Sequence, residues 1–143
     1  MKELDKGIGI WQIIDSSQVT DIISASGFDF TLIDLEHGSF NINSIQNCVF
    51  ASKSSKLKTF VRLPSVSYEE IVRVIDTGID GILFPHIENN HDLENIIKKT
   101  FLPPIGEKSF SPFVSKYKYG LHKNLDNTNP FLGILIESKG KTT

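Results

Sequence analysis

The segment LIDLEHG (residues 32–38) places two carboxylates and an imidazole at the end of an apolar run. Asp34 and Glu36 both lie within three residues of His37. An imidazole oriented by a carboxylate is an effective general base near neutral pH, because the anion fixes the tautomer and raises the basicity of the other ring nitrogen. This segment therefore predicts a proton-transfer site. The alternative is a strand that simply reaches the surface, where its charges are solvated.

Two further charged residues end apolar runs: Arg62 in FVRLP and Glu137 in GILIE. A guanidinium can bind a carboxylate through two parallel hydrogen bonds, which suits an organic acid substrate. The alternative for Arg62 is a structural ion pair with Asp34 or Asp76.

Glu137 could be one ligand of a hard divalent cation such as Mg²⁺ or Mn²⁺. Its alternative is a solvated carboxylate, since one carboxylate does not make a metal site.

The remaining histidines do not form a recognisable metal-binding motif. His86, His91 and His122 lack metal-ligand spacing with Cys48 and with one another. We therefore expect these three histidines to be surface or loop residues.

The elements that position these groups alternate between two periodicities. Residues 7–14, 28–35, 58–63, 81–85 and 131–137 have the apolar, β-branched and aromatic character of strands. Helical spacing follows each of the first four runs, for example at residues 43–52 and 92–99. This alternation predicts right-handed βαβ units around a parallel sheet, and hence an α/β fold.

Local signals mark the ends of the predicted helices. Ser16 and Ser17 can cap the first helix, and Gly27 and Gly78 follow the first and third helices, as glycine commonly does. The pattern S-x-x-E at residues 67–70 predicts a capping box at the start of the third helix.

The position of the polar residues distinguishes a barrel from an open doubly wound sheet. The candidate groups fall at the carboxyl ends of four successive strands, whereas a doubly wound sheet concentrates its site at one switch point. This distribution favours a (β/α)8 TIM-barrel type of fold. A complete barrel takes about 250 residues, so only about the first five βα units are present, as a single domain over residues 1–143.

Composition excludes several classes of protein. The 143 residues are 39% hydrophobic and 22% charged, with a net charge of -2, so we expect a globular protein with no binding face for nucleic acid or an anionic membrane. The single cysteine cannot form an internal disulfide, and no apolar run approaches the length of a membrane helix. We therefore expect a soluble, cytoplasmic protein.

Five motifs together resemble, in order and spacing, the HpcH/HpaI aldolase family over nearly the whole chain. The motifs are GFDFTLIDLEHG (residues 27–38), VRLP (61–64), IDTGIDGILFPHIE (75–88), LPPIGEKS (102–109) and GILIES (133–138). The resemblance implies a metal-dependent class II pyruvate aldolase on a (β/α)8 barrel that assembles into homo-oligomers. It also implies Mg²⁺, Mn²⁺ or Co²⁺ as the metal, and a 2-oxo acid and an aldehyde as the small molecules that the enzyme cleaves or joins.

The resemblance assigns a role to each candidate residue. His37 would be the catalytic base, with Asp34 as its carboxylate partner. Asp76 would belong to the network that supports the histidine, either within the subunit or from across a subunit contact. Arg62 would bind the substrate near its oxo-acid group, and Glu137 would be a metal ligand.

The chain departs from the family pattern at three places. The second metal carboxylate of the family lies in a GPxDL segment after the sixth strand, beyond the 143 residues. Leu135 replaces a glutamine, and Lys108-Ser109 replaces an arginine-glycine pair; lysine keeps the charge but not the planar fork. A truncated gene product, a fragment and one piece of a split barrel are all compatible with this pattern.

Three functional hypotheses follow from the sequence. The first is a pyruvate-type aldolase. The second is a non-catalytic partial barrel that needs a partner chain or an oligomer, because five strands leave open edges and an exposed apolar interior. The third, an unrelated barrel enzyme of phosphorylated substrates, is disfavoured because the sequence lacks a glycine-rich phosphate site.

Overall fold

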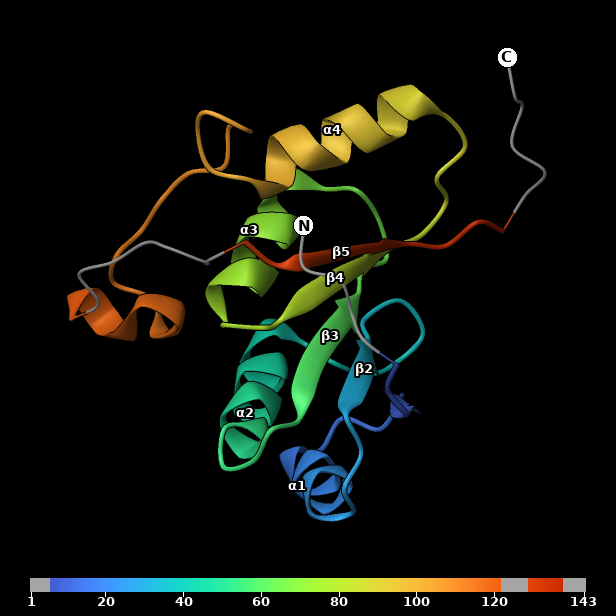
Figure 1. Ribbon diagram of the computed structural model, residues 1–143, viewed down its shortest axis with the longest axis vertical. Coiled ribbons are helices and arrows are strands. Elements are labelled where there is room, and N and C mark those ends of the chain that lie inside the picture. The colour runs from blue at the N-terminus through green and yellow to red at the C-terminus, as the bar shows by residue number, and fades with distance from the viewer. Residues whose placement is uncertain (1–5, 122–128, 138–143) are drawn as a thin grey trace.

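Strands and helices alternate in the computed structural model, which describes residues 6–121 and 129–137 (Figure 1). The strands are β1 (Gly9–Gln12), β2 (Phe30–Asp34), β3 (Lys58–Arg62), β4 (Gly81–Phe84) and β5 (Phe131–Ile134). The helices are α1 (Ser17–Ala25), α2 (Ile42–Ser52), α3 (Tyr68–Asp76), α4 (Asn90–Thr100) and the 3₁₀ helix η1 (Ser115–Gly120). All five predicted strands and four predicted helices are confirmed, although β1 and β5 are shorter than their apolar runs.

The five strands form one parallel sheet in the order β1-β2-β3-β4-β5. Each strand therefore pairs with the next one in the sequence, as in a barrel, whereas a doubly wound sheet reverses its order at a switch point. The sheet is open, with β1 and β5 at its edges. The predicted α/β class is confirmed.

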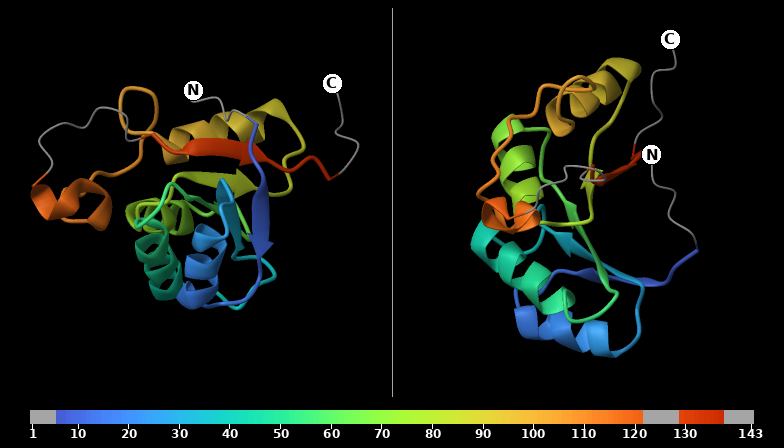
Figure 2. Two further views of the ribbon diagram at one scale, coloured as in Figure 1. Left: turned by 60° about the horizontal axis from the view of Figure 1, so that its bottom comes forward. Right: turned by 60° about the vertical axis from the view of Figure 1, so that its left-hand side comes forward.

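Helices α1 to α4 lie along one face of the sheet (Figure 2). The core between this face and the helices is formed by apolar side chains with at most 2% exposure. Among them are Ile33, Val61, Ile82 and Phe84 from the strands, and Ile45, Val49, Ile71, Val74, Ile75 and Ile96 from the helices. Burial of each such side chain stabilises the fold by roughly 1.5–3 kcal/mol, so this layer holds the strand ends in place.

The opposite, inner face of the sheet carries aromatic side chains at its amino end. The ring of Phe60 lies 5.5 Å from that of Phe30 and 5.7 Å from that of Phe131, measured between centroids. A Cβ atom at Gly9 would meet the Phe30 ring, and one at Gly81 would lie 2.7 Å from an atom of the Phe60 ring. The two glycines therefore make the room that the aromatic rings fill.

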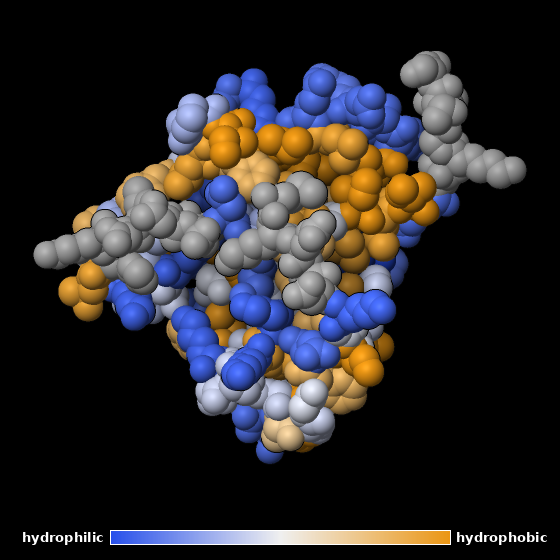
Figure 3. Space-filling view, viewed as in Figure 1, coloured by the Kyte–Doolittle hydropathy of each residue, from blue (hydrophilic) through white to orange (hydrophobic). Residues whose placement is uncertain are grey.

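Apolar side chains are also exposed on the inner face and at the two sheet edges. A hollow of about 200 Å³ is lined by Phe30, Leu32, Phe60, Ile82, Leu83, Phe131 and Gly133. Trp11 and Ile13 are exposed at the β1 edge, and Ile134 and Ile136 at the β5 edge. Figure 3 shows apolar side chains gathered over the region of β4 and β5. In a closed barrel such a surface is interior.

The predicted capping box of α3 is wrong. Ser67 is the N-cap residue of α3, but its side chain makes no capping hydrogen bond. The Glu70 carboxylate instead accepts a hydrogen bond from the Ser65 hydroxyl at 3.1 Å, which removes it from the backbone of the cap. Capping boxes that the sequence did not predict occur at Asn41 with Ser44 and at Asn89 with Asp92.

The described helices are short, at 9 to 11 residues for α1 to α4. None of them, within the part of the chain that the structure describes, has the length and apolar composition needed to cross a bilayer.

Candidate active site at the carboxyl ends of the strands

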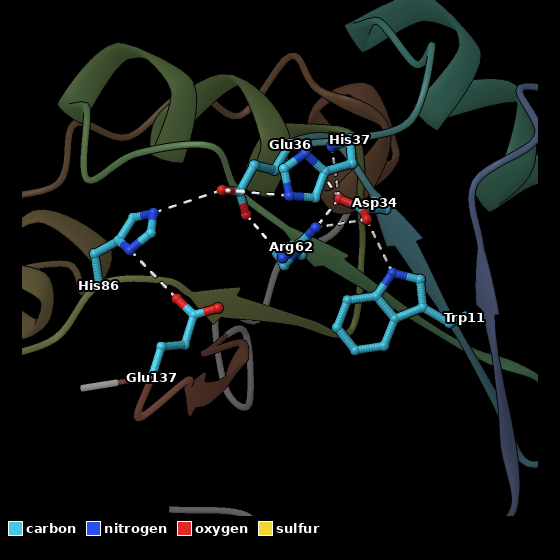
Figure 4. A network of polar contacts seen from close by, with 7 residues as sticks. All are labelled: Trp11, Asp34, Glu36, His37, Arg62, His86 and Glu137. Atoms are coloured by element: carbon cyan, nitrogen blue, oxygen red, sulfur yellow. Dashed lines mark hydrogen bonds and ion pairs between the residues drawn. The ribbon is translucent and has the colours of Figure 1, made fainter. Parts of the chain in front are cut away.

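Four of the five predicted site residues meet at the carboxyl rim of the sheet (Figure 4). Asp34 and Arg62 are the last residues of β2 and β3 and are paired in register. His37 lies in the turn that follows β2, and Glu137 lies three residues beyond β5. The parallel sheet therefore brings together residues that are up to 103 positions apart, from 34 to 137.

Asp34 and Arg62 form a bidentate ion pair. Arg62 Nε donates to Asp34 Oδ1 at 3.0 Å, and Nη2 donates to Oδ2 at 2.7 Å. The two side chains are only 3% and 7% exposed. The structural ion pair with Asp34, one of the alternatives for Arg62, is thus present.

Asp34 accepts three further hydrogen bonds. Trp11 Nε1 donates to Oδ2, and the backbone N–H groups of Glu36 and His37 donate to Oδ1, each at 3.0 Å. Burial alone would raise the pKa of Asp34, but the bonds from Arg62, Trp11 and the His37 backbone, with the guanidinium charge, lower it to about 2. The hydrogen bonds that Arg62 donates to this carboxylate raise the pKa of Arg62. Both groups are therefore charged at neutral pH.

The imidazole of His37 is exposed and is paired differently from the prediction. Its Nε2 lies 3.9 Å from Glu36 Oε1. Asp34 binds the main-chain N–H of His37. Within the described residues, Glu36 is thus the carboxylate within 4 Å of the ring, and the expected pairing of the imidazole with Asp34 is corrected. The reason is that both Asp34 oxygens are occupied by other donors.

Glu36, which the sequence analysis named beside His37 but to which the family resemblance assigned no role, lies at the centre of the network. Its Oε2 is 2.8 Å from Arg62 Nη1, and its Oε1 is 3.5 Å from His86 Nε2. Glu36 Oε2 is buried and makes no hydrogen bond among the described residues, so its contact with Arg62 is an attraction of charges without hydrogen-bond alignment.

His86 connects Glu36 to Glu137. Its Nδ1 lies 3.3 Å from Glu137 Oε2, and the His86 and Glu137 side chains are 65% and 46% exposed. His86 lies in the loop after β4, as predicted, with a φ of 57°, in the left-handed region where histidine occurs more often than most residues. Its contacts with two site carboxylates were not predicted, because the order of the strands does not show where the side chains of the following loops point.

Asp76 does not join this cluster within the chain. It ends α3, and the chain then turns into the amino end of β4, so Asp76 lies toward the opposite rim of the sheet. There it accepts a hydrogen bond from Lys108 Nζ at 3.1 Å, and the Lys108 side chain is only 3% exposed. Lys108 therefore keeps the positive charge of the arginine that it replaces in the family pattern, and this charge forms an ion pair with Asp76.

Comparison with known sequences identifies the family. A sequence profile of the HpcH/HpaI aldolase/citrate lyase family matches residues 7–140. The chain belongs to this family. The resemblance drawn from the five motifs is confirmed.

The relatives that match this chain include proteins named as aldolases. The chain is 28% identical over 149 aligned residues to a hydroxypyruvate/pyruvate aldolase of Roseobacter denitrificans, covering 99% of this chain and 57% of the relative. It is 25% identical over 143 residues to a 2-keto-3-deoxy-L-rhamnonate aldolase of Salmonella gallinarum, covering 99% and 54%. The chain thus spans about half the length of these relatives.

Solved structures of the HpcH/HpaI family share the fold. A family protein from Burkholderia cenocepacia superposes with a TM-score of 0.88 at 21% identity, covering 94% of this chain and 56% of the other. An HpcH/HpaI aldolase from Desulfitobacterium hafniense superposes with a TM-score of 0.81 at 20% identity, covering 94% and 54%. The open sheet is therefore a partial barrel of this family, as predicted.

The donor atoms at the rim suit part of a metal site. Glu137 offers a half-exposed carboxylate, and the imidazole of His86 offers a nitrogen. Both groups are ligands for divalent ions such as Mn²⁺ and Co²⁺. Within residues 6–121 and 129–137, however, no three His, Cys, Asp or Glu side chains are grouped closely enough to hold a metal. Among the described residues the rim therefore offers two donors, Glu137 and His86, and the other ligands of a cation bound there would have to come from substrate and water.

Proposed function

We propose that this chain carries the base and one metal ligand of an aldolase that cleaves or forms 4-hydroxy-2-oxo acids. The observation that supports this most directly is the meeting of an exposed imidazole, a buried guanidinium and a carboxylate at one strand rim of a family whose named relatives are aldolases. We infer a divalent cation, Mg²⁺, Mn²⁺ or Co²⁺, with Glu137 as a ligand. When bound, such an ion supplies Lewis acidity to the oxygens of the 2-oxo acid.

His37 is the residue that moves the proton in this proposal. In the cleavage direction, a base removes the proton of the C4 hydroxyl, the C3–C4 bond breaks, and its electron pair enters the enolate of pyruvate as an aldehyde leaves. A proton then returns to C3. General base catalysis of this type contributes roughly 10²- to 10⁴-fold to the rate. Asp34 is unsuited to this task, because its pKa is about 2 and both its oxygens accept hydrogen bonds.

Arg62 binds the carboxylate of the 2-oxo acid in this proposal. The guanidinium has five N–H groups, and the described contacts place Nε, Nη2 and Nη1 on Asp34 and Glu36. The remaining N–H group of each Nη atom has no hydrogen-bond partner among the described residues, and a substrate carboxylate can accept from them. Asp34 holds the planar group in a fixed orientation for this contact.

Asp76 belongs to a subunit contact in this proposal. Asp76 lies toward the opposite rim of the sheet within the chain, bonded to Lys108, so a contact with the histidine would require its presentation by a neighbouring subunit. We therefore propose that the site works in a homo-oligomer of a cytoplasmic enzyme, in which Asp76 of one subunit supports the histidine of another.

Loss of the pyruvate methyl proton signal in D₂O, followed by NMR, tests the proposal. The chain is incubated with pyruvate and Mg²⁺, Mn²⁺ or Co²⁺, and the metal is removed with EDTA before the spectrum is recorded. We expect exchange that requires metal and that falls at least about 100-fold in His37→Ala, in keeping with the loss of a general base. Glu137→Ala should also abolish the metal-dependent exchange, because it removes a metal ligand.

The variant His91→Ala is the matched control, because His91 is an exposed histidine of α4 with no predicted role. Exchange no faster than with metal alone would contradict the assignment of catalysis to these residues.

The exposed apolar inner face supports a second candidate function, a partial barrel that binds a partner chain or further copies without catalysis. The hollow of about 200 Å³ has an entirely apolar lining, and both sheet edges carry exposed apolar side chains. Light scattering tests this candidate, since a stable monomer at high concentration would contradict it.

A further inference from the structure

His86 contacts a carboxylate on each side of its ring, and the proton-transfer proposal does not use it. Nδ1 faces Glu137 Oε2 at 3.3 Å, and Nε2 faces Glu36 Oε1 at 3.5 Å. The three residues follow three different strands, β4, β5 and β2 (Figure 4). Both contacts are at ion-pair distance, and the arrangement also allows a second interpretation, in which a cation lies between Nδ1 and Oε2.

The separation of Nδ1 and Oε2 matches that of two ligands on one cation. Metal–nitrogen and metal–oxygen bonds of about 2.1 Å place adjacent ligand atoms about 3.0 Å apart at a right angle and about 3.4 Å apart at a tetrahedral angle. The observed 3.3 Å lies within this range. The two atoms also come from side chains that are 65% and 46% exposed, so further positions remain open to a 2-oxo acid and water.

Glu36 is placed to orient the ring. A metal-bound histidine usually donates its other ring N–H to a carboxylate, which fixes the tautomer and the ring orientation. Glu36 Oε1 lies on the Nε2 side of His86, and Glu36 Oε2 is held 2.8 Å from the buried guanidinium of Arg62. The carboxylate is thus anchored on one side and available to the imidazole on the other.

We propose that His86 and Glu137 together bind one divalent cation, with Glu36 as the carboxylate that orients the imidazole. This inference rests on the proposed metal-dependent function and adds a nitrogen ligand to it. A nitrogen ligand favours Mn²⁺ or Co²⁺, because Mg²⁺ prefers a shell made only of oxygen. His86 would then supply a donor where Glu137 is the sole carboxylate ligand within the described residues.

Pulsed EPR of bound Mn²⁺, without pyruvate, tests this inference. Electron spin-echo envelope modulation detects a directly coordinated imidazole nitrogen. We expect nitrogen modulation in the unaltered chain and in His91→Asn, and its loss in His86→Asn. Asparagine is the chosen replacement because it tolerates the left-handed backbone at position 86.

The variant Glu36→Gln separates the ligand from its orienting partner. It should keep the nitrogen modulation while the affinity for Mn²⁺ falls about tenfold, as is usual when an outer partner of a metal-binding histidine is removed. Circular dichroism checks that each variant is folded.

The inference is overturned if the unaltered chain does not bind Mn²⁺, if bound Mn²⁺ shows no nitrogen modulation, or if the modulation survives in His86→Asn or disappears in His37→Asn instead. Failure of the proposed function has a different signature. In that case nitrogen modulation is present, but the pyruvate methyl protons do not exchange.

Discussion

Arg62 donates a hydrogen bond to each carboxylate oxygen of Asp34, with N–O distances of 3.0 and 2.7 Å. The two residues lie on adjacent strands, and their side chains are almost fully buried. The register of β2 and β3 sets the two residues opposite each other at the last position of each strand. The pair therefore ties the carboxyl ends of two strands together at the point where the turn that carries His37 begins.

Removal of one partner of this pair should destabilise the fold strongly. In Asp34→Asn the buried guanidinium loses its counter-charge, and we expect the free energy of unfolding to fall by about 3–5 kcal/mol. Urea denaturation measures the change. Glu107→Gln is the control, because it removes an exposed ion pair with Lys98, and we expect a change below about 1 kcal/mol. Equal changes in the free energy of unfolding for the two substitutions would contradict the proposed contribution of Asp34 to stability.

The stability of the fold should also depend on pH through Asp34. The pKa of its carboxyl is lowered from 3.8 to about 2 in the folded state. A lowered pKa means that the unfolded state binds the proton more tightly, so the stabilisation is complete above pH 3.8 and is lost as the pH falls toward 2. The difference corresponds to about 2 kcal/mol.

Urea denaturation at a series of pH values between 2 and 6 measures this effect of Asp34, whose pKa is about 2. The slope between pH 4 and pH 2 should be reduced in Asp34→Asn, which has no carboxyl to titrate at this position. An unchanged slope would assign the acid sensitivity to other groups.

The parts of the site that sequence analysis predicted are those that local patterns fix. Buried strands ending in charged residues placed Asp34, Arg62 and Glu137 on one rim, because parallel strands have a common direction. The partner of each charge was harder to predict. The predicted fold already implies that β1 adjoins β2 and β4 adjoins β5. It does not specify which side chains on neighbouring strands turn toward the network, as those of Trp11 and His86 do.

Two errors have a common physical origin. The capping box at Ser67 and the pairing of Asp34 with the His37 ring were both predicted from residues close in sequence. In the structure Glu70 bonds to Ser65, and Asp34 is occupied by a donor from another strand. A short polar side chain has several partners within reach, and tertiary contacts decide among them.

Trp11 should contribute to the low pKa of Asp34 through its indole N–H. Trp11→Phe removes the 3.0 Å hydrogen bond to Oδ2 but leaves an aromatic ring near Arg62, whose guanidinium carbon is 5.1 Å from the Trp11 ring centroid. We expect the pKa of Asp34 to rise and the acid transition to move to higher pH. The carboxyl carbon chemical shift of Asp34, followed by NMR against pH, measures this directly. Ile13→Val, at the same exposed edge, should leave the titration unchanged.

Gly81 should be the least replaceable glycine of the inner face. A Cβ atom there would lie 2.7 Å from the Phe131 carbonyl oxygen and 2.7 Å from the Phe60 ring, and a backbone atom cannot move aside cheaply. We expect Gly81→Ala to lower the free energy of unfolding by about 1–3 kcal/mol, as overpacking usually does.

Gly133→Ala is the matched control on the neighbouring strand, because its Cβ would meet only the tip of Leu83 at 2.8 Å, and that side chain can rotate. Thermal unfolding of both variants decides the matter: a smaller loss in Gly81→Ala than in Gly133→Ala would mean that the aromatic layer is not packed against the β4 backbone.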